Sequence, residues 1–182
     1  MNYQIFENAV NALTTWRMHN SKPNYEFPDI RVPDFQKLCQ AHSVTAQDFG
    51  KAIVCLCCWR EMRSELYTGM IAVANVINNR AKKGWYGGDP YTNTIEKNQF
   101  SSMTVPDDPQ LDKYPDGNDV EFGKLLDKID ALYDGQLVDR TDGALYYAVL
   151  ADSTSSWFLK NIADNPKQHE RVAQIGQTVF YT

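Results

Sequence analysis

The sequence predicts an α+β fold that is mainly helical and has a small β element. Two observations indicate this class. Apolar side chains recur at helical spacing over most of the chain, whereas only two short segments, 143–151 and 178–182, have the composition of strands. The 182 residues, 43% of them hydrophobic, are long enough for one domain with its own core and short for two.

The N-terminal part predicts two helices separated by a proline-containing stretch. An amphipathic helix is expected over residues 3–18, where apolar side chains follow helical spacing at Ile5, Phe6, Ala9, Val10, Leu13 and Trp16. Prolines interrupt any helix between residues 19 and 35, and a short helix is expected over 35–42. Because 44 residues are too few to be stable alone, we expect residues 1–44 to be a helical extension packed on a main domain of residues 45–182.

Two longer helices are predicted at the start of that main domain. Thr45, with Asp48 three residues later, resembles an N-cap followed by an acidic first turn, and the helix is expected to run to about Ser64. Its apolar side includes Val54, Cys57 and Cys58 and continues through Glu61 and Glu65. The next helix is expected over residues 68–84, from a Thr68 cap to Gly84.

The remainder of the chain predicts one long loop, one helix and the small β element. Residues 84–118 are rich in Gly, Pro, Asn and Asp, which indicates a structured loop of a length that is usually functional. An amphipathic helix is expected over residues 119–135. A short helix over 166–176 is expected to separate the two strand candidates.

Charge and hydropathy exclude several classes of function. The net charge of −5 argues against a dedicated nucleic-acid binder and against tight docking on an anionic membrane. No stretch approaches the 18 or so apolar residues of a membrane span, so no membrane insertion is expected. The first 20 residues lack the basic start and apolar core of a signal peptide. We expect a monomer that needs no cofactor.

Glu61 is the candidate catalytic residue, because it lies at the end of an apolar run, Ala52 to Trp59, and on the apolar side of the predicted helix. A general acid needs a raised pKa to keep its proton near neutral pH. Cys57, Cys58 and Trp59 would raise the pKa of Glu61 by desolvation, and the charge of Glu65 would add to the rise. The alternative is a solvated acidic pair on a helix end, with Arg60 and Arg63 as partners.

The cysteines suggest a second interpretation. Cys39, His42, Cys55 and Cys58 have the spacing of a four-ligand zinc site, which would suit a non-catalytic structural or adaptor protein with a Cys3His centre. However, Cys55 and Cys58 would lie inside a long helix, where cysteine is usually a buried hydrophobe. We therefore expect reduced thiols and no metal, and keep the zinc protein as the alternative.

Several motifs, in the same order along the chain, resemble those of the SleB-type cell wall hydrolase family. "WREMRSE" (59–65) resembles its Y-G-E-A-R-G-E motif, and "GMIAVANVINNR" (69–80) is similar to its GQVAVAAVVLNR helix. "NQFSS" (98–102) falls where the family has GQFS or GAFT. "GALYY" (143–147) and "IGQTVFY" (175–181) match its closing motifs, so the resemblance covers about three quarters of the chain.

The resemblance implies a lysozyme-like fold of the lytic-transglycosylase type. It implies that bacterial peptidoglycan is the partner and that the β-1,4 bond between N-acetylmuramic acid and N-acetylglucosamine is cleaved, as lytic transglycosylases do. Glu61 occupies the position of the catalytic acid. The positions matching the family's second Glu, its cleft loop and its tyrosine pair are expected to bind substrate: Glu65, Gln99, Phe100, Ser101 and Tyr146.

The sequence departs from the family motif around Glu61 and leaves the outcome of the reaction open. Arg60, Met62 and Ser64 replace Gly, Ala and Gly, and these larger residues are expected to narrow or reshape the cleft.

A loop carboxylate could make the enzyme a hydrolase, or muramidase, instead. The candidates are Asp107, Asp108 and Asp112. We favour transglycosylation, because these aspartates lie beside prolines in what reads as a solvated turn.

Small size, wall-cutting chemistry and the lack of a signal peptide favour a bacteriophage protein, either an endolysin or a virion-associated lysin. Such a protein would be made in the cytoplasm. It would act on the cell wall or in the periplasm after release, or be carried in the virion.

Overall fold

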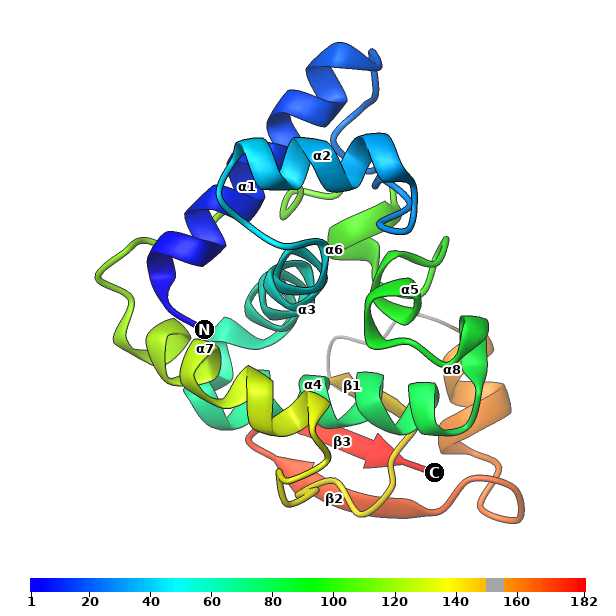
Figure 1. Ribbon diagram of the computed structural model, residues 1–182. Coiled ribbons are helices and arrows are strands. Elements are labelled where there is room, and N and C mark those ends of the chain that lie inside the picture. The colour runs from blue at the N-terminus through cyan, green and yellow to red at the C-terminus, as the bar shows by residue number, and fades with distance from the viewer. Residues whose placement is uncertain (150–155) are drawn as a thin grey trace.

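One buried helix runs through the centre of the protein (Figure 1). The computed structural model of the chain describes residues 1–149 and 156–182. The central helix, α3 (Ala46–Met62), is buried along most of its length, as expected for a helix that is apolar on nearly all sides. The helices that contact it are α1 (Tyr3–His19), α2 (Pro33–Ala41), α4 (Leu66–Lys82), α5 (Pro90–Ile95), α6 (Ser101–Thr104) and α7 (Val120–Tyr133).

The start of α3 agrees with the prediction from the sequence, whereas its end does not. At its start, the Thr45 hydroxyl accepts a hydrogen bond from the Asp48 backbone N–H at 3.0 Å, which confirms the predicted N-cap. At its end, α3 stops at Met62, and a 3₁₀ turn over Arg63–Glu65 precedes α4. The prediction of a helix to Ser64 was wrong, and so was the Thr68 cap, because the chain reverses here to pack α4 against α3.

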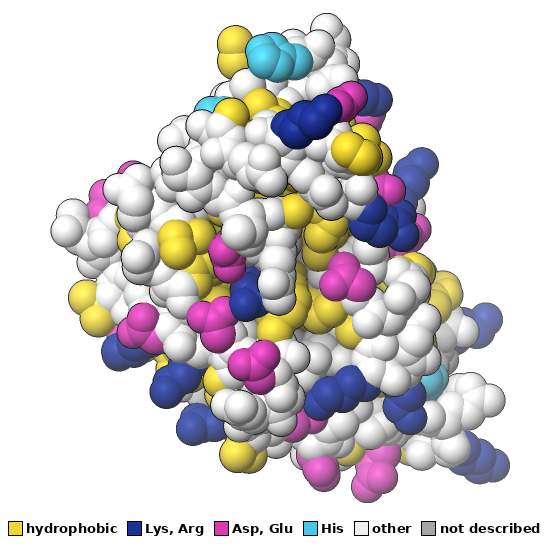
Figure 2. All heavy atoms as spheres, viewed as in Figure 1, with side chains coloured by type: hydrophobic (Ala, Val, Ile, Leu, Met, Phe, Trp, Pro, Cys, Tyr) yellow, Lys and Arg dark blue, Asp and Glu magenta, His cyan; other side chains and the backbone are white. Residues whose placement is uncertain are grey.

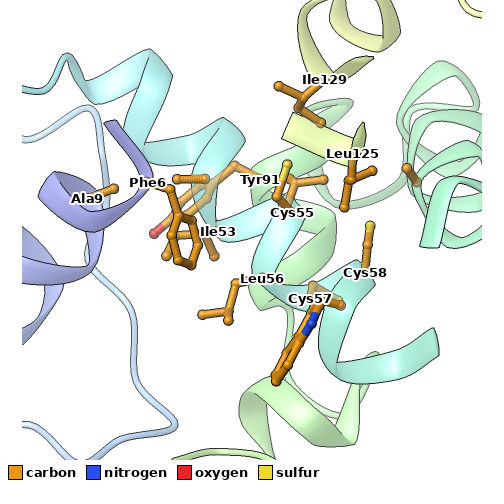
Figure 3. Close-up of a cluster of buried hydrophobic side chains, with 14 of the residues drawn as sticks. Phe6, Ala9, Ile53, Cys55, Leu56, Cys57, Cys58, Tyr91, Leu125 and Ile129 are labelled. Atoms are coloured by element: carbon orange, nitrogen blue, oxygen red, sulfur yellow. The ribbon is translucent and has the colours of Figure 1, made fainter. Parts of the chain in front are cut away.

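The N-terminal helices share the core of α3. Phe6 and Leu13 of α1 are buried in the same hydrophobic cluster as α3, and Phe35 and Cys39 join it from α2. The Phe6 ring packs edge-on against Phe122 of α7, with ring centroids 4.8 Å apart. Figure 3 shows this cluster, with Phe6 and Ala9 of α1 beside Ile53 and Leu56 of α3. The division into an extension, 1–44, and a domain, 45–182, stays a prediction.

The predicted loop of residues 84–118 contains short helices. A 3₁₀ turn over Trp85–Gly87 is followed by α5 and α6. Asp89 caps α5 by accepting from the Thr92 backbone N–H at 3.0 Å, and Pro90 occupies the first helical position, where its missing N–H costs nothing. An Asp-Pro pair can thus begin a helix as well as a loop, which is why the prediction of a continuous loop was wrong.

Three antiparallel strands form the sheet, in the order β1-β3-β2. They are β1 (Tyr146–Val149), β2 (Arg171–Ile175) and β3 (Thr178–Tyr181). Strands were predicted at β1 and β3, whereas the helix predicted over 166–176 was wrong: Gly176, at φ 55°, turns the chain so that β2 pairs with β3 as a hairpin. The predicted strand residues 150 and 151 lie outside the described residues.

The sheet packs on the face of α4 that lies away from α3 (Figure 1). Ala72 and Val76 of α4 form a small core with Ala144 and Phe180. α8 (Ser156–Phe158) and a π-helical turn over Leu159–Ala163 lie between β1 and β2 along the chain. The predicted fold class, mainly helical with a small β element, is confirmed.

The surface carries both signs of charge. Figure 2 shows acidic and basic side chains interspersed over the face it draws, around a hollow with exposed hydrophobic side chains. None of the helices in the described part of the chain combines the length and apolar character needed to cross a membrane.

Candidate active site

A cavity of about 630 Å³ lies where the C-terminal ends of α3 and α4 meet β1, α8 and the segment between α5 and α6. It brings together one carboxyl group, one guanidinium, several amides and hydroxyls, and exposed aromatic rings. The lining residues are Glu61, Arg80, Asn98, Gln99, Ser101, Tyr146, Tyr147, Ala148, Trp157 and Phe158. A cavity that combines aromatic surfaces with convergent polar groups is typical of a binding site for a small molecule or a polymer segment.

Glu61 is held by a hydroxyl group on each of its carboxyl oxygens. The Ser102 hydroxyl donates to Oε1 at 2.5 Å, and the Tyr147 hydroxyl donates to Oε2 at 2.8 Å. Ser102 comes from α6 and Tyr147 from β1, so three elements distant in sequence fix one carboxyl group. Its geometry is therefore set before any ligand arrives.

The environment of Glu61 raises its pKa above the usual value for a glutamate. Burial is the main cause, and the negative charge of Asp108 adds to it. The hydrogen bonds from Ser102 and Tyr147 favour the ionised form and act in the opposite direction, but they do not outweigh burial. A carboxyl group in this state keeps its proton at higher pH than an ordinary glutamate, as a general acid requires.

Tyr147 owes its place to the register of the sheet. It lies opposite Phe180 of β3, and the two rings have centroids 5.8 Å apart. Burial and the neighbouring Glu61 raise the pKa of Tyr147 well above its usual value, so its hydroxyl stays protonated and able to donate. The adjacent Tyr146 instead packs edge-on against Trp85, at 5.7 Å between centroids, at the wall of the cavity.

Of the residues predicted from the sequence, the structure brings Glu61, Gln99, Ser101 and Tyr146 to this cavity. Phe100 is only 2% exposed and belongs to the hydrophobic core.

Glu65 also lies away from the lining. Its Oε1 accepts from the Gln177 backbone N–H, at 3.2 Å, on the turn between β2 and β3. Gly176 of that turn lies so close that a Cβ there would come within 1.9 Å of the carboxylate. The prediction that Glu61 and Glu65 share one face of one helix was wrong, because Glu65 follows the end of α3 and supports the hairpin turn.

Sequence reasoning missed Ser102, Tyr147 and Arg80 as members of the site. Ser102 follows the predicted Ser101, and only the start of α6 decides which hydroxyl turns inward. Arg80, 6% exposed, donates from Nε to the Leu145 carbonyl at 2.7 Å and so ties α4 to the chain just before β1. The strand period of two, which places Tyr146 and Tyr147 on opposite faces, was the one available signal for Tyr147.

The four residues of the alternative zinc site are not gathered together. Figure 3 shows Cys55 and Cys58 packed among apolar side chains, near Leu125 and Ile129 of α7. Burial raises the pKa of the Cys55 and Cys58 thiols and that of Cys39, the last to about 11, which disfavours the thiolate form that binds metal. Over residues 1–149 and 156–182, no group of three or more His, Cys, Asp and Glu side chains is arranged to hold a metal ion.

The loop carboxylates are outside the lining of the cavity. Asp112 accepts from the Asn24 side chain at 2.9 Å, and Asp108 accepts from the Gln110 backbone N–H at 2.9 Å. Asp107 is exposed. Asp108 influences Glu61 through its charge, as described above.

The substitutions around Glu61 do not narrow the cavity in the way expected from the sequence. Arg60 and Met62 are buried, 4% and 3% exposed, and Ser64 is exposed; none of the three is among the lining residues. Arg60 points instead into the segment that follows α6.

Comparison with known structures confirms the predicted lysozyme-like fold. The catalytic domain of the germination-specific lytic transglycosylase SleB from Bacillus anthracis is similar, with 23% identity, a TM-score of 0.54, and coverage of 73% of this chain and 93% of that one. The catalytic domain of the Bacillus cereus SleB protein is also similar, with 25% identity, a TM-score of 0.52, and coverage of 73% and 89%. A comparison with curated proteins gives no match.

Residues 64–181 match the model of the cell wall hydrolase family. The match begins just after Glu61, so the role of that residue rests on its geometry and on the motif around it. It spans well over half of the chain and contains the helix, loop and tyrosine motifs that carried the resemblance. The protein therefore belongs to the cell wall hydrolase family, and it is an enzyme that degrades peptidoglycan.

Proposed function

We propose that the protein cleaves the β-1,4 bond between N-acetylmuramic acid and N-acetylglucosamine as a lytic transglycosylase, with Glu61 as its single catalytic carboxyl group. The observation that carries this proposal is the environment of Glu61: a carboxyl group at the wall of a cavity, desolvated, and fixed by hydroxyls on both oxygens. The similar Bacillus anthracis domain is itself named a lytic transglycosylase.

The first step is the transfer of a proton. Protonated Glu61 gives its proton to the glycosidic oxygen as that bond breaks, and an oxocarbenium-like muramic acid forms. The Glu61 carboxylate left behind accepts hydrogen bonds from Ser102 and Tyr147, which already lie in position. Donors fixed in advance stabilise charge as it develops in the transition state without reorganising.

The second step returns the proton. The Glu61 carboxylate takes the proton from the 6-hydroxyl of the muramic acid, and that oxygen bonds to C1 to close a 1,6-anhydro ring. No water is consumed, and no second carboxylate is needed. Two-carboxylate glycosidases instead require partners about 5 to 9.5 Å apart across the sugar. Glu61 is the one carboxylate among the described residues that line the cavity.

The cavity also offers surfaces for sugar rings. Trp157 is 60% exposed at its edge, and Tyr146 lies in its wall, so both present aromatic faces to a ligand. Asn98, Gln99 and Ser101 supply amide and hydroxyl groups for the N-acetyl and hydroxyl groups of the glycan. We assign these residues to substrate binding.

The product of digestion tests this mechanism. Purified peptidoglycan treated with the protein should release muropeptides ending in 1,6-anhydro-muramic acid, which mass spectrometry detects as one water lighter than hydrolytic products. Glu61→Gln keeps the shape but cannot donate the proton, so activity should fall by about 10²–10⁴-fold in a folded protein. Retention of most activity by Glu61→Gln would contradict the role of Glu61.

A lysozyme-type hydrolase is the competing outcome. It would yield reducing-end muramic acid as the sole product and lose activity when one further carboxylate is neutralised. The variants to compare are Asp107→Asn, Asp108→Asn and Asp112→Asn, together with Asp152→Asn, which falls in the segment that the structure does not describe. Under the proposed mechanism, Asp107→Asn and Asp112→Asn leave the anhydro product and its rate unchanged.

A further inference from the structure

Arg60 immediately precedes Glu61, yet its side chain extends away from the cavity. It is 4% exposed, and its guanidinium donates to three backbone carbonyls of one segment: Nη1 to Ser102 at 3.1 Å, Nη2 to Leu111 at 2.6 Å and Nε to Lys113 at 3.1 Å. The guanidinium also lies over the Tyr114 ring, 5.1 Å from its centroid. A buried cation spanning both ends of one segment fixes that segment against α3.

The segment held in this way, residues 102–113, carries a group that touches Glu61. Ser102 accepts from Arg60 through its backbone carbonyl and donates to Glu61 through its hydroxyl. Arg60 and Glu61, which are adjacent in sequence, are therefore both hydrogen-bonded to the same residue of α6. Between Thr104 and α7 the structure shows turns and bends with no helix or strand, so secondary structure does not fix this stretch.

We propose that Arg60 is a positioning residue for the reaction: its guanidinium holds the segment 102–113 so that the Ser102 hydroxyl stays on the Glu61 carboxyl group. The proposal rests on the proposed function of Glu61. A planar guanidinium can satisfy three carbonyls at fixed angles, whereas the small ammonium of a lysine cannot span them. Glycine, which the resembling motif has at this position, would make none of these bonds.

Other groups also act on Glu61 and must be kept constant in a test. Tyr147 from β1 and Asp108 from the held segment shift its pKa, the Cys57 and Cys58 thiols of α3 lie within reach of its charge, and Arg80 of α4 lines the same cavity. Because Ser102 and Asp108 lie on the same segment and shift the pKa of Glu61 in opposite directions, the sign of a single Arg60 substitution is not diagnostic. The diagnostic quantity is the coupling between Arg60 and Ser102.

A double-mutant cycle measures that coupling. In the wild-type background, Ser102→Ala should lower kcat by about tenfold or more and move the alkaline limb of the kcat/KM profile to higher pH, because the carboxylate loses a donor. Arg60→Met should lower kcat to a similar extent with a smaller change in KM. In the Arg60→Met background, Ser102→Ala should then change kcat by less than about twofold and leave the limb in place.

Two further variants keep the test decisive. Arg60→Lys retains the positive charge but loses the three guanidinium hydrogen bonds, so under the proposal it should abolish the coupling as Arg60→Met does. It also replaces Arg60→Met in the cycle if that variant fails to fold. Arg31→Met removes an arginine that pairs with Asp29, at 2.8 Å, and that forms no hydrogen bond with the held segment, all of which the structure describes, so it should preserve the coupling. Hydrogen exchange should show faster exchange of amides 103–113 in Arg60→Lys, with the amides of α3 still protected.

An equal effect of Ser102→Ala in both backgrounds, with all proteins folded, would overturn the proposal. Unchanged exchange over residues 103–113 in Arg60→Lys would overturn it as well, independently of any activity. Failure of the proposed function has a different signature: the wild-type protein itself would release no anhydro-muropeptides from purified peptidoglycan.

Discussion

The pKa of Glu61 is set by two opposing effects of its surroundings. Burial favours the neutral acid, and the Ser102 and Tyr147 hydroxyls favour the carboxylate. The acid form is needed first and the base form second, so a residue stabilised strongly in either state would be slow in one step. The net upward shift of the Glu61 pKa has consequences for both stability and rate.

Glu61→Gln should stabilise the folded protein at neutral pH. Because burial raises the pKa of Glu61 above the unfolded value near 4.5, the unfolded chain loses this proton first, and the folded state is penalised as pH rises. Each tenfold difference in proton affinity corresponds to about 1.4 kcal/mol. Urea unfolding should show the gain at pH 7 and its disappearance below about pH 4.5, where both states hold the proton.

The control for that measurement is Glu96→Gln, since Glu96 is exposed. It should change the free energy of unfolding by less than about 0.5 kcal/mol at either pH. A gain from Glu61→Gln that is equally large at pH 4 and pH 7 would mean that packing, and not the buried charge, is its cause.

Tyr147→Phe should move the alkaline limb of the kcat/KM profile to higher pH and lower kcat by about tenfold. The phenol donates to the Glu61 carboxylate, so its removal raises the pKa of the acid and leaves the developing carboxylate less stabilised. The profile of kcat/KM against pH measures both effects. Tyr146→Phe is the matched control, because Tyr146 makes no hydrogen bond to Glu61 and should leave the limb in place. A limb unmoved in Tyr147→Phe would show that this hydrogen bond does not govern the acid.

The junction between α3 and α4 is the strained part of the scaffold. Leu66, which begins α4, has φ 57° and ψ −158°, a region that residues other than glycine almost never adopt. Its side chain is 58% exposed and contributes little packing. The strain lies five residues after Glu61 in the sequence, where the chain must turn sharply for α4 to return along α3.

Leu66→Gly should raise the free energy of unfolding by about 1 kcal/mol. Relief of a strained backbone contributes about 1–3 kcal/mol, and the greater freedom of glycine in the unfolded chain offsets about 0.5–1 kcal/mol of it. Chemical denaturation measures the difference. Val138→Gly is the control, because Val138 is 78% exposed and its φ is not positive. This variant should lower the free energy of unfolding or leave it unchanged. If Leu66→Gly were no more stable than the wild-type protein, backbone strain at Leu66 would be contradicted.

The sequence predicted elements well where one apolar period runs without interruption. The start of α3 at Thr45 and the helices α1 and α7 followed from spacing and capping. It predicted poorly where tertiary contacts decide. The helix expected over 166–176 became β2 because β3 offers it a partner, and the continuation past Met62 failed because α4 packs back on α3.

The candidate site shows the same division. Glu61, Gln99, Ser101 and Tyr146 were predicted from motifs and line the cavity. Ser102 and Tyr147 were missed because their role depends on which of two adjacent hydroxyls turns toward α3, and sequence spacing does not determine that. Arg60 was expected at the cleft, but the carbonyls it binds come from a segment about 50 positions away.

At the scale of the whole molecule, the core surrounds the central helix along its length, and the cavity lies at the C-terminal end of that helix. Phe6 packs against Phe122 near the N-terminal helices, whereas Glu61 lies at the C-terminal end of α3. Stability and catalysis should therefore respond separately to substitutions in these two regions. The expected placement of the protein in a phage, or outside the cell that makes it, stays a prediction.

Phe6→Ala should cost about 3–5 kcal/mol of stability with little effect on kcat per folded molecule. Phe6 is 2% exposed, and truncation of such a side chain leaves a cavity in the core. Thermal or urea unfolding gives the first quantity, and activity normalised to the folded fraction gives the second. The exposed Met18, replaced by Ala, should change neither by much. A fall in kcat of Phe6→Ala comparable to that of Tyr147→Phe would show that the two regions are coupled.

The order of strands in the sheet has a consequence for biosynthesis. The last strand in sequence, β3, is the central one, and within the described residues it is the strand with which β1 pairs. Chains emerge from the ribosome N-terminal end first, at about 5–20 residues per second. While residues 178–181 are still inside the ribosome, β1 cannot pair with β3. Tyr147 of β1, whose hydroxyl donates to Glu61, then has no fixed position. An enzyme that attacks cell walls is thus assembled as a catalyst only after residues 178–181 have left the ribosome, and a chain that stops before β3 would contain Glu61 without a correctly placed Tyr147.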